Sequence, residues 1–108
     1  ITASIVNNVK KFVLNSFKAM GLKEEDAKIF TDALMFSELR FHSGQGQGVQ
    51  RITTYYKRIN NNEVNINSDF EILKESSSLA LVDAKNGIGT VQASKCMDLA
   101  ISKAKKEG

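Results

Sequence analysis

The stretch LALVDAKNGIGTVQA, from Leu79 to Ala93, decides the fold class, because it carries the chain from an apolar segment through a glycine-containing loop into a helical pattern. The run LALV at Leu79–Val82 lies between a serine cluster and DAKNG, which is typical of a short buried strand. A helix is expected from about Thr90 to Lys106, because apolar residues recur there at helical steps. These residues are Ala93, Met97, Ala100, Ile101 and Ala104. A strand that leads into a helix predicts a mixed α/β fold.

A second strand is expected just upstream of this stretch. Phe70 and Ile72 alternate with the charged Glu71, which is the period of a strand with one apolar face. The serines at 76–78 fit a turn between this strand and LALV. Residues 63–108 therefore predict a strand, a second strand and an amphipathic helix.

Residues 1–62 carry helical periodicity. A first helix over about 2–20 has apolar residues at three- and four-residue steps, and Gly21 follows where a helix would end. A second helix begins with the acidic residues of KEEDA, which suit the positive end of a helix dipole, and ends near Arg40. It is apolar on more than one side, so we expect broad burial. A third, short helix over about 52–59 ends in the turn-rich NNNEVN.

Composition restricts the classes of protein. The 108 residues suffice for one structural unit, and no apolar run approaches the roughly 20 residues that a membrane-spanning helix needs. The formal net charge is +3, but acidic residues lie between several of the lysines, which argues against a nucleic-acid partner. The single cysteine, Cys96, can form neither an internal disulfide nor a metal cluster, and it fits a buried thiol in the cytoplasm. The sequence starts at Ile1 without a secretory-signal pattern, so we expect a segment of a longer chain.

Two glycine-rich loops are candidates for binding phosphate. NGIGTVQA at 86–93 reads G-x-G-x-x-x-A between a strand and a helix, close to a dinucleotide fingerprint. However, DAKN separates the strand from the first glycine, so the alternative is a loop that needs a positive φ at Asn86 or Gly87. FHSGQGQGVQR at 41–51 follows a helix, which fits neither a Walker loop nor a Rossmann turn.

Several separated segments resemble one enzyme family in their order and spacing. They are GLKEEDAKIFTDALMFSELR (21–40), GVQRITTYYKRINNNEVN (48–65) and LALVDAKNGIGTVQASKCMDLAISKAKKEG (79–108). Together they resemble the amino-terminal part of the malate/L-lactate dehydrogenase family, which also includes ureidoglycolate dehydrogenase and diketogulonate reductase. Members carry an LR…SHGVxR segment, a Y…R helix followed by a turn, and an ALVDG(D/N)xGxG strand and loop that lead to an AMxxAIxKA helix. The resemblance covers nearly all of the chain from Gly21 onward.

This resemblance implies a fold and an activity. The fold would be part of a larger, non-Rossmann dehydrogenase, with amino-terminal helices over 1–62 and a strand-strand-helix part over 63–108 in a single unit. The enzyme would move a hydride between NAD or NADP and C2 of a small 2-hydroxy or 2-oxo acid of the malate or lactate type. The family also implies a homodimer. The alternative is a catalytically silent helical module that uses the same fold for interaction or dimerisation.

The resemblance assigns Arg51 to the substrate. Counted back through Gln50, Val49 and Gly48, it matches the arginine of the SHGVxR segment. A planar guanidinium can hold both oxygens of a carboxylate, so Arg51 is the expected ligand of the substrate carboxylate. The alternative is a solvent-facing arginine early in the third helix.

The proton donor is where the sequence departs from the family. Aligned from the downstream GVQR, Gln47 occupies the place of the motif's histidine; aligned from the upstream LR, Gln45 does. Neither alignment reaches His42, because the loop is two residues longer than the family's. Glutamine can donate a hydrogen bond but cannot act as an acid. Three hypotheses follow. His42 reaches the site across five residues, which span at most about 17 Å; Gln47 orients the substrate while an acid outside the chain supplies the proton; or the activity is lost.

Overall fold

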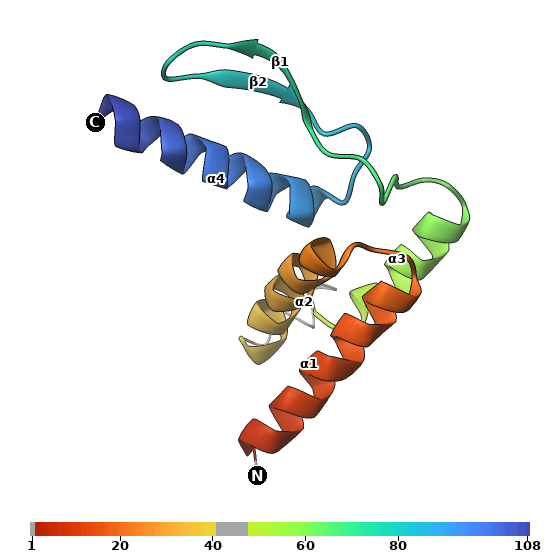
Figure 1. Ribbon diagram of the computed structural model, residues 1–108. Helices are drawn as coiled ribbons and strands as arrows, with labels where there is room; N and C mark the ends of the chain where they lie inside the picture. The colour runs from red at the N-terminus through yellow and green to blue at the C-terminus, as the bar shows by residue number, and fades with distance from the viewer. Residues whose placement is uncertain (1, 41–47) are drawn as a thin grey trace.

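The elements follow the expected order of three helices, two strands and a helix (Figure 1). The computed structural model describes residues 2–40 and 48–108. Their elements are α1 (Thr2–Ala19), α2 (Glu24–Leu39), α3 (Arg51–Asn60), β1 (Glu71–Glu75), β2 (Ala80–Asp83) and α4 (Gly89–Glu107). The mixed α+β fold is therefore confirmed, and each element lies within a few residues of its predicted bounds.

Helix ends follow the predicted local chemistry. Gly21 ends α1 with a φ of +103°, in the left-handed region that glycine adopts without strain. Its N–H donates to the Lys18 carbonyl, and the N–H of Leu22 donates to that of Phe17. The first turn of α2 holds three acidic residues, and the last turn of α4 holds Lys105 and Lys106, so both helices complement their dipoles.

The core lies where α1, α2 and α3 meet, and Ile88 and Val91 at the start of α4 belong to the same buried cluster. The rings of Phe17 and Phe30 stack with their centroids 4.6 Å apart, and Tyr55 meets Phe30 edge-on at 4.8 Å. Val13 and Ala27 are fully buried beside them. The expectation of broad burial for α2 is correct for one wide face only, because Phe36 on its far side is 57% exposed. Apolar burial on this scale is the main force holding the three helices together.

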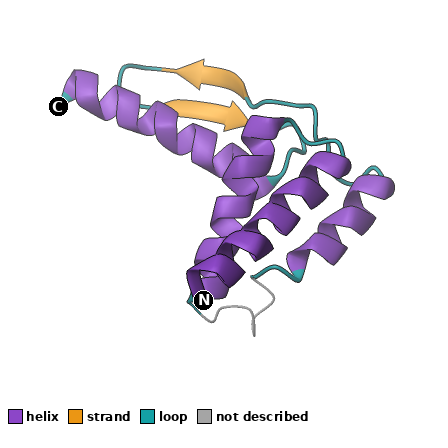
Figure 2. Cartoon of the chain, turned by 60° about the horizontal axis from the view of Figure 1, so that its bottom comes forward, coloured by secondary structure: helices purple, strands orange, loops and turns teal. Residues whose placement is uncertain are grey.

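The two strands form an antiparallel hairpin that lies along α4 and apart from the three-helix core (Figures 1 and 2). Ile72 pairs with Val82 and Lys74 with Leu81, so Leu73 forms a bulge. The expectation that LALV is a buried strand is wrong: Leu79 is 73% exposed and Leu81 is 59% exposed. The reason is that a two-stranded sheet has only one face against α4, and no further element of the described residues covers the other.

The face of α4 that packs inward also differs from the expected one. The predicted apolar face of Ala93, Met97, Ala100, Ile101 and Ala104 is exposed. Val91 and Gln92 are buried instead, and Cys96 and Leu99 are half-buried and line a pocket shared with β2 of the hairpin. Helical spacing correctly predicted a helix, but it could not show which side the neighbouring elements would cover.

Besides the apolar contacts of Ile88 and Val91, hydrogen bonds link the two halves of the molecule at a polar joint, which we define as residues 63–69 together with residues 85–95. The Asn86 side-chain amide donates to the Glu63 carbonyl at 2.9 Å, and the Asn65 N–H donates to the Asn86 carbonyl at 2.8 Å. The Ser68 hydroxyl donates to the Lys85 carbonyl at 3.1 Å. These bonds fix the start of α4 against the connection that follows α3.

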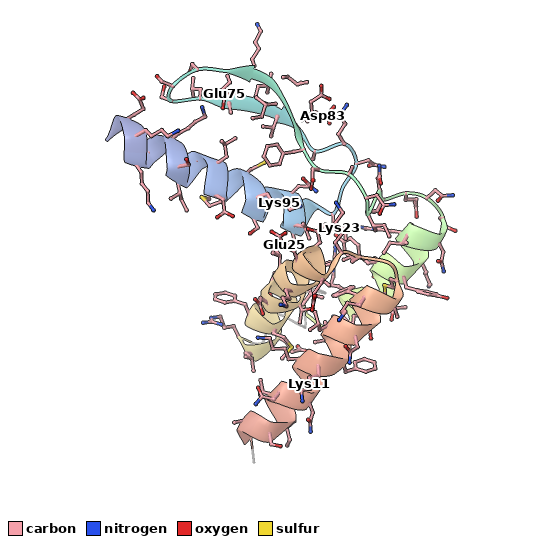
Figure 3. All side chains as sticks on the ribbon, viewed as in Figure 1. Lys11, Lys23, Glu25, Glu75, Asp83 and Lys95 are labelled. Atoms are coloured by element: carbon pink, nitrogen blue, oxygen red, sulfur yellow. The ribbon has the colours of Figure 1, made fainter. Side chains whose placement is uncertain are left out.

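Lys95 ties the joint to α2. Its ammonium lies 3.0 Å from Oδ1 of Asp26, on the first turn of α2, and 2.6 Å from Oδ1 of Asp69. Figure 3 labels Lys95 near the start of α4, beside the end of α2 that carries Glu25. The Asp26 side chain is only 7% exposed, so this ion pair is largely buried, and a buried charge needs such a partner.

Candidate functional site

The candidate substrate site begins at the turn that starts α3. Gly48 is buried, and its carbonyl accepts a hydrogen bond from the Arg51 N–H at 3.0 Å. The Val49 carbonyl accepts from the Ile52 N–H, also at 3.0 Å. These tight turns fix the backbone of Arg51 at the first residue of the helix.

Arg51 is anchored through the aromatic core. Its guanidinium carbon lies 5.3 Å from the centroid of the Tyr55 ring, within the range of a cation–π contact. Tyr55 is buried and packs edge-on against Phe30. Arg51 itself is half-buried. The side chain expected to hold the substrate carboxylate therefore has a rigid base and a partly exposed position.

The electrostatics at this point favour an anion. The first turn of α3 contains no acidic residue, and the N-terminal end of a helix carries partial positive charge. The charge of Arg51 adds to that of the helix end. The N–H groups of residues 51–53 already donate to the carbonyls of residues 48–50, so the attraction for a carboxylate comes from the Arg51 charge and the helix dipole and not from these N–H groups.

His42 and Gln47, the two candidate catalytic residues, lie outside the described residues. Of the three site residues predicted from the sequence, the described part of the chain contains Arg51 alone.

In the loop at residues 86–93, Gly87 packs closely against a side chain of α4. Asn86 has a φ of +61° and Lys85 of +55°, so the expectation of a positive φ is correct at Asn86, whereas Gly87 does not have one. A Cβ on Gly87 would lie 2.9 Å from Nε2 of Gln92. A Cβ on Gly89, the second glycine, would meet nothing within 4 Å. The fingerprint interpretation is disfavoured instead by topology, because β2 ends at Asp83, four residues before Gly87, and pairs antiparallel with β1.

Sequence reasoning missed the cluster of Lys95, Asp26 and Asp69. The hydrogen bond from Lys95 lowers the pKa of the Asp69 carboxyl below its usual 3.8, with the charges of Lys95 and Lys23 adding to the effect. The hydrogen bond to Asp69 likewise raises the pKa of Lys95 above 10.5, although partial burial opposes this. No local pattern could have revealed the cluster, because its members are more than twenty residues apart and meet only in the fold.

Residues 2–40 and 48–108 contain neither a candidate membrane span nor a candidate metal cluster. No helix in these ranges is both long and apolar enough to cross a membrane. No group of three or more His, Cys, Asp or Glu side chains in the same ranges could hold a metal ion.

The fold is that of a class of dehydrogenases. It superposes on malate dehydrogenase from Pyrococcus horikoshii OT3 with a TM-score of 0.89 at 35% identity, covering 95% of this chain and 29% of that one. Sulfolactate dehydrogenase from Methanocaldococcus jannaschii gives a TM-score of 0.87 at 35% identity, again over 95% and 29% of the two chains.

The sequence model of the malate/L-lactate dehydrogenase family matches residues 5–108, and the chain belongs to this family. The L-sulfolactate dehydrogenase of Methanocaldococcus jannaschii is 37% identical over 101 residues, which cover 94% of this chain and 29% of the relative. The malate dehydrogenase of Pyrococcus abyssi is 39% identical over 97 residues, or 90% of this chain and 26% of the relative. The chain thus spans less than a third of the length of these relatives.

Proposed function

We propose that this chain is the amino-terminal part of an oxidoreductase that transfers a hydride between NAD or NADP and C2 of a small 2-hydroxy or 2-oxo acid. The observation that carries the proposal is the family match over residues 5–108. The names of the relatives support it, because malate and sulfolactate are both 2-hydroxy acids. A cytoplasmic location and a homodimer belong to the same proposal.

Arg51 is proposed to bind the substrate carboxylate. Its support is the motif GVQR, the half-buried position and the positive end of α3 beside it. Fixing the carboxylate would hold C2, the adjacent carbon, in one orientation for the reaction. This positioning lowers the entropic part of the barrier.

The substrate is proposed to carry a second anionic group. Malate has a second carboxylate and sulfolactate has a sulfonate, whereas lactate has neither. An acid of this kind suits a site where the charge of Arg51 and the dipole of α3 are both positive. Oxaloacetate and sulfopyruvate are therefore better first substrates to test than pyruvate.

The cofactor is proposed to be held by parts of the protein beyond this chain. When bound, NAD or NADP supplies the hydride chemistry at C2. The glycine loop that precedes α4 matches the dinucleotide fingerprint poorly, because β2 ends four residues before Gly87 and pairs antiparallel with β1. We accordingly assign no cofactor ligand to the described residues.

The proton for the C2 oxygen has two candidate sources in the enzyme. In one hypothesis His42 donates it; in the other Gln47 only orients the substrate, and an acid outside this chain donates it. The pH profile of kcat/KM separates them, because a histidine acid gives a titration near neutrality that the His42→Ala variant loses. If His42→Ala keeps the profile and the rate of the wild type, the histidine hypothesis fails.

The role of Arg51 is tested by Arg51→Met in the full-length enzyme. Loss of a charged hydrogen bond to the substrate should lower kcat/KM by an amount equivalent to ~1.5 to 3 kcal/mol. Steady-state kinetics with oxaloacetate and a reduced nicotinamide would measure it.

Arg58→Met is the matched control for this variant. Arg58 lies 5.2 Å from the same Tyr55 ring, but in the last turn of α3. We expect it to leave kcat/KM within about twofold of the wild type, since it sits away from the helix start. Equal losses in both variants would show that Tyr55 packing, and not carboxylate binding, is what Arg51 contributes.

A further inference from the structure

A small cavity lies inside the polar joint, at the point where three elements converge. Its volume is about 10 Å³, and its lining includes Asp26 of α2, Asn65 and Ser68 of the connection after α3, and Gln92 of α4. A cavity of this size is just large enough for one water molecule. The cavity is separate from the candidate substrate site at Arg51.

Gln92 presents an unpaired acceptor in this region. The residue is 4% exposed, and its Nε2 donates to the Ser68 carbonyl at 3.1 Å. A carbonyl oxygen can only accept, so this bond fixes which end of the amide is the nitrogen. Oε1 is therefore directed away from Ser68, and it is buried without a hydrogen-bond donor from the protein.

The glutamine is locked in this orientation by its packing. A Cβ at Gly87 would lie 2.9 Å from its Nε2 and 3.0 Å from its Cγ, so only glycine leaves room for it there. The hydroxyl of Ser68 is meanwhile directed at the Asn65 and Lys85 carbonyls. The Ser68 hydroxyl is thus committed elsewhere, and a buried amide oxygen without a partner is costly.

We propose that the joint binds one structural water molecule, which donates a hydrogen bond to Oε1 of Gln92. Its second hydrogen would go to another acceptor of the lining, for which the buried Asp26 carboxylate is the strongest candidate. Such a water bridges α2 and α4 and completes the hydrogen bonding of the joint.

A water molecule fits this position better than a cation does. Gln92 and Asp26 supply oxygen atoms that a sodium or potassium ion would also accept. However, the Lys95 ammonium already lies 3.0 Å from Oδ1 of Asp26, and it would repel a second positive charge. A neutral donor satisfies Oε1 without this repulsion.

A high-resolution crystal structure of the full-length protein tests the proposal. We expect one fully occupied water peak within about 3.2 Å of Oε1 of Gln92. Absence of the peak, a protein donor on Oε1, or a peak that appears only with sodium or potassium in the buffer would each overturn it.

Two variants sharpen the test. In Gln92→Met the peak should be lost while the pair of Lys95 and Asp26 remains. In Thr31→Val, which removes a buried hydroxyl that also lacks a partner but does not line the cavity, the peak should persist. A peak that persists in Gln92→Met would show that Gln92 does not hold the water.

A solution measurement on the unaltered protein covers the case in which Gln92→Met fails to fold. We expect magnetisation transfer between a long-lived water and the Gln92 side-chain amide by NMR. Transfer absent from this amide, in a protein whose other buried waters are detected, would contradict the proposal.

Discussion

At the scale of single residues, Lys95 forms a largely buried ion pair that links α4 to α2. It meets Asp26, which is buried, and Asp69, which is exposed. The pair with Asp26 contributes more to stability than the pair with Asp69, because its buried charges are poorly screened by water. Arg51, by contrast, contributes through its position at the start of α3.

Lys95→Met should destabilise the protein by about 2 kcal/mol, because it leaves the Asp26 carboxylate buried without its cation. Lys103→Met is the matched control: Lys103 also lies on α4 and meets two acceptors, the Glu75 carboxylate and the Ser76 carbonyl. Since the Glu75 side chain is 44% exposed, this variant should cost at most about 1 kcal/mol. Urea unfolding measures both, and equal losses would contradict the special role of the buried pair.

The pH dependence of stability should follow the same contact. The pKa of Asp69 is lowered, so its contribution is present above 3.8 and is lost as the pH falls through the depressed folded value. The pKa of Lys95 is raised, so its contribution is present below 10.5 and is lost as the pH rises through the elevated folded value. Lys95→Met should flatten both ends of the unfolding profile, and an unchanged acid limb would show that Asp69 gains nothing from the pair.

At the scale of elements, the loop that leads into α4 depends on one glycine and tolerates change at the next. Gly87 packs directly against Gln92, whereas a Cβ on Gly89 would meet nothing within 4 Å. Substitutions at Gly87 and at Gly89 therefore distinguish the effect of side-chain packing on stability from the effect of backbone flexibility.

Gly87→Ala should destabilise the protein by about 1 to 2 kcal/mol, because Gln92 must move from its bond to Ser68. Gly89→Ala, in the first turn of α4, should instead stabilise by about 0.5 kcal/mol through a less flexible unfolded chain. Thermal unfolding of the two variants gives the comparison. A Gly87→Ala variant as stable as the wild type would mean that Gln92 is not held as described.

Local chemistry predicted the elements well but not their surroundings. The helical period of the apolar residues, the acidic first turn of α2 and Gly21 predicted the helices, since these signals act within a few residues. The exposure of LALV and of the predicted face of α4 could not be read from the pattern, because burial depends on which elements pack alongside. For the site, the motif directed attention to Arg51, whereas Gln92 and Lys95 emerged only from contacts between distant segments.

At the scale of the whole molecule, the chain joins a three-helix core to a hairpin and helix through a polar joint (Figure 1). It belongs to the malate/L-lactate dehydrogenase family and spans less than a third of its relatives. The hairpin leaves four leucine or isoleucine side chains exposed on β1, β2 and the turn between them. Because this chain spans only part of its relatives' length, activity should be measured on the full-length protein.

The most direct measurement is the absorbance of NADH or NADPH, followed while the full-length protein is mixed with oxaloacetate, sulfopyruvate and pyruvate. Our account predicts loss of the nicotinamide absorbance with at least one of these acids and formation of the corresponding 2-hydroxy acid. A well-folded full-length protein that turns over none of a broad panel of 2-oxo acids with either cofactor would contradict it, and would favour a catalytically silent interaction module on the same fold.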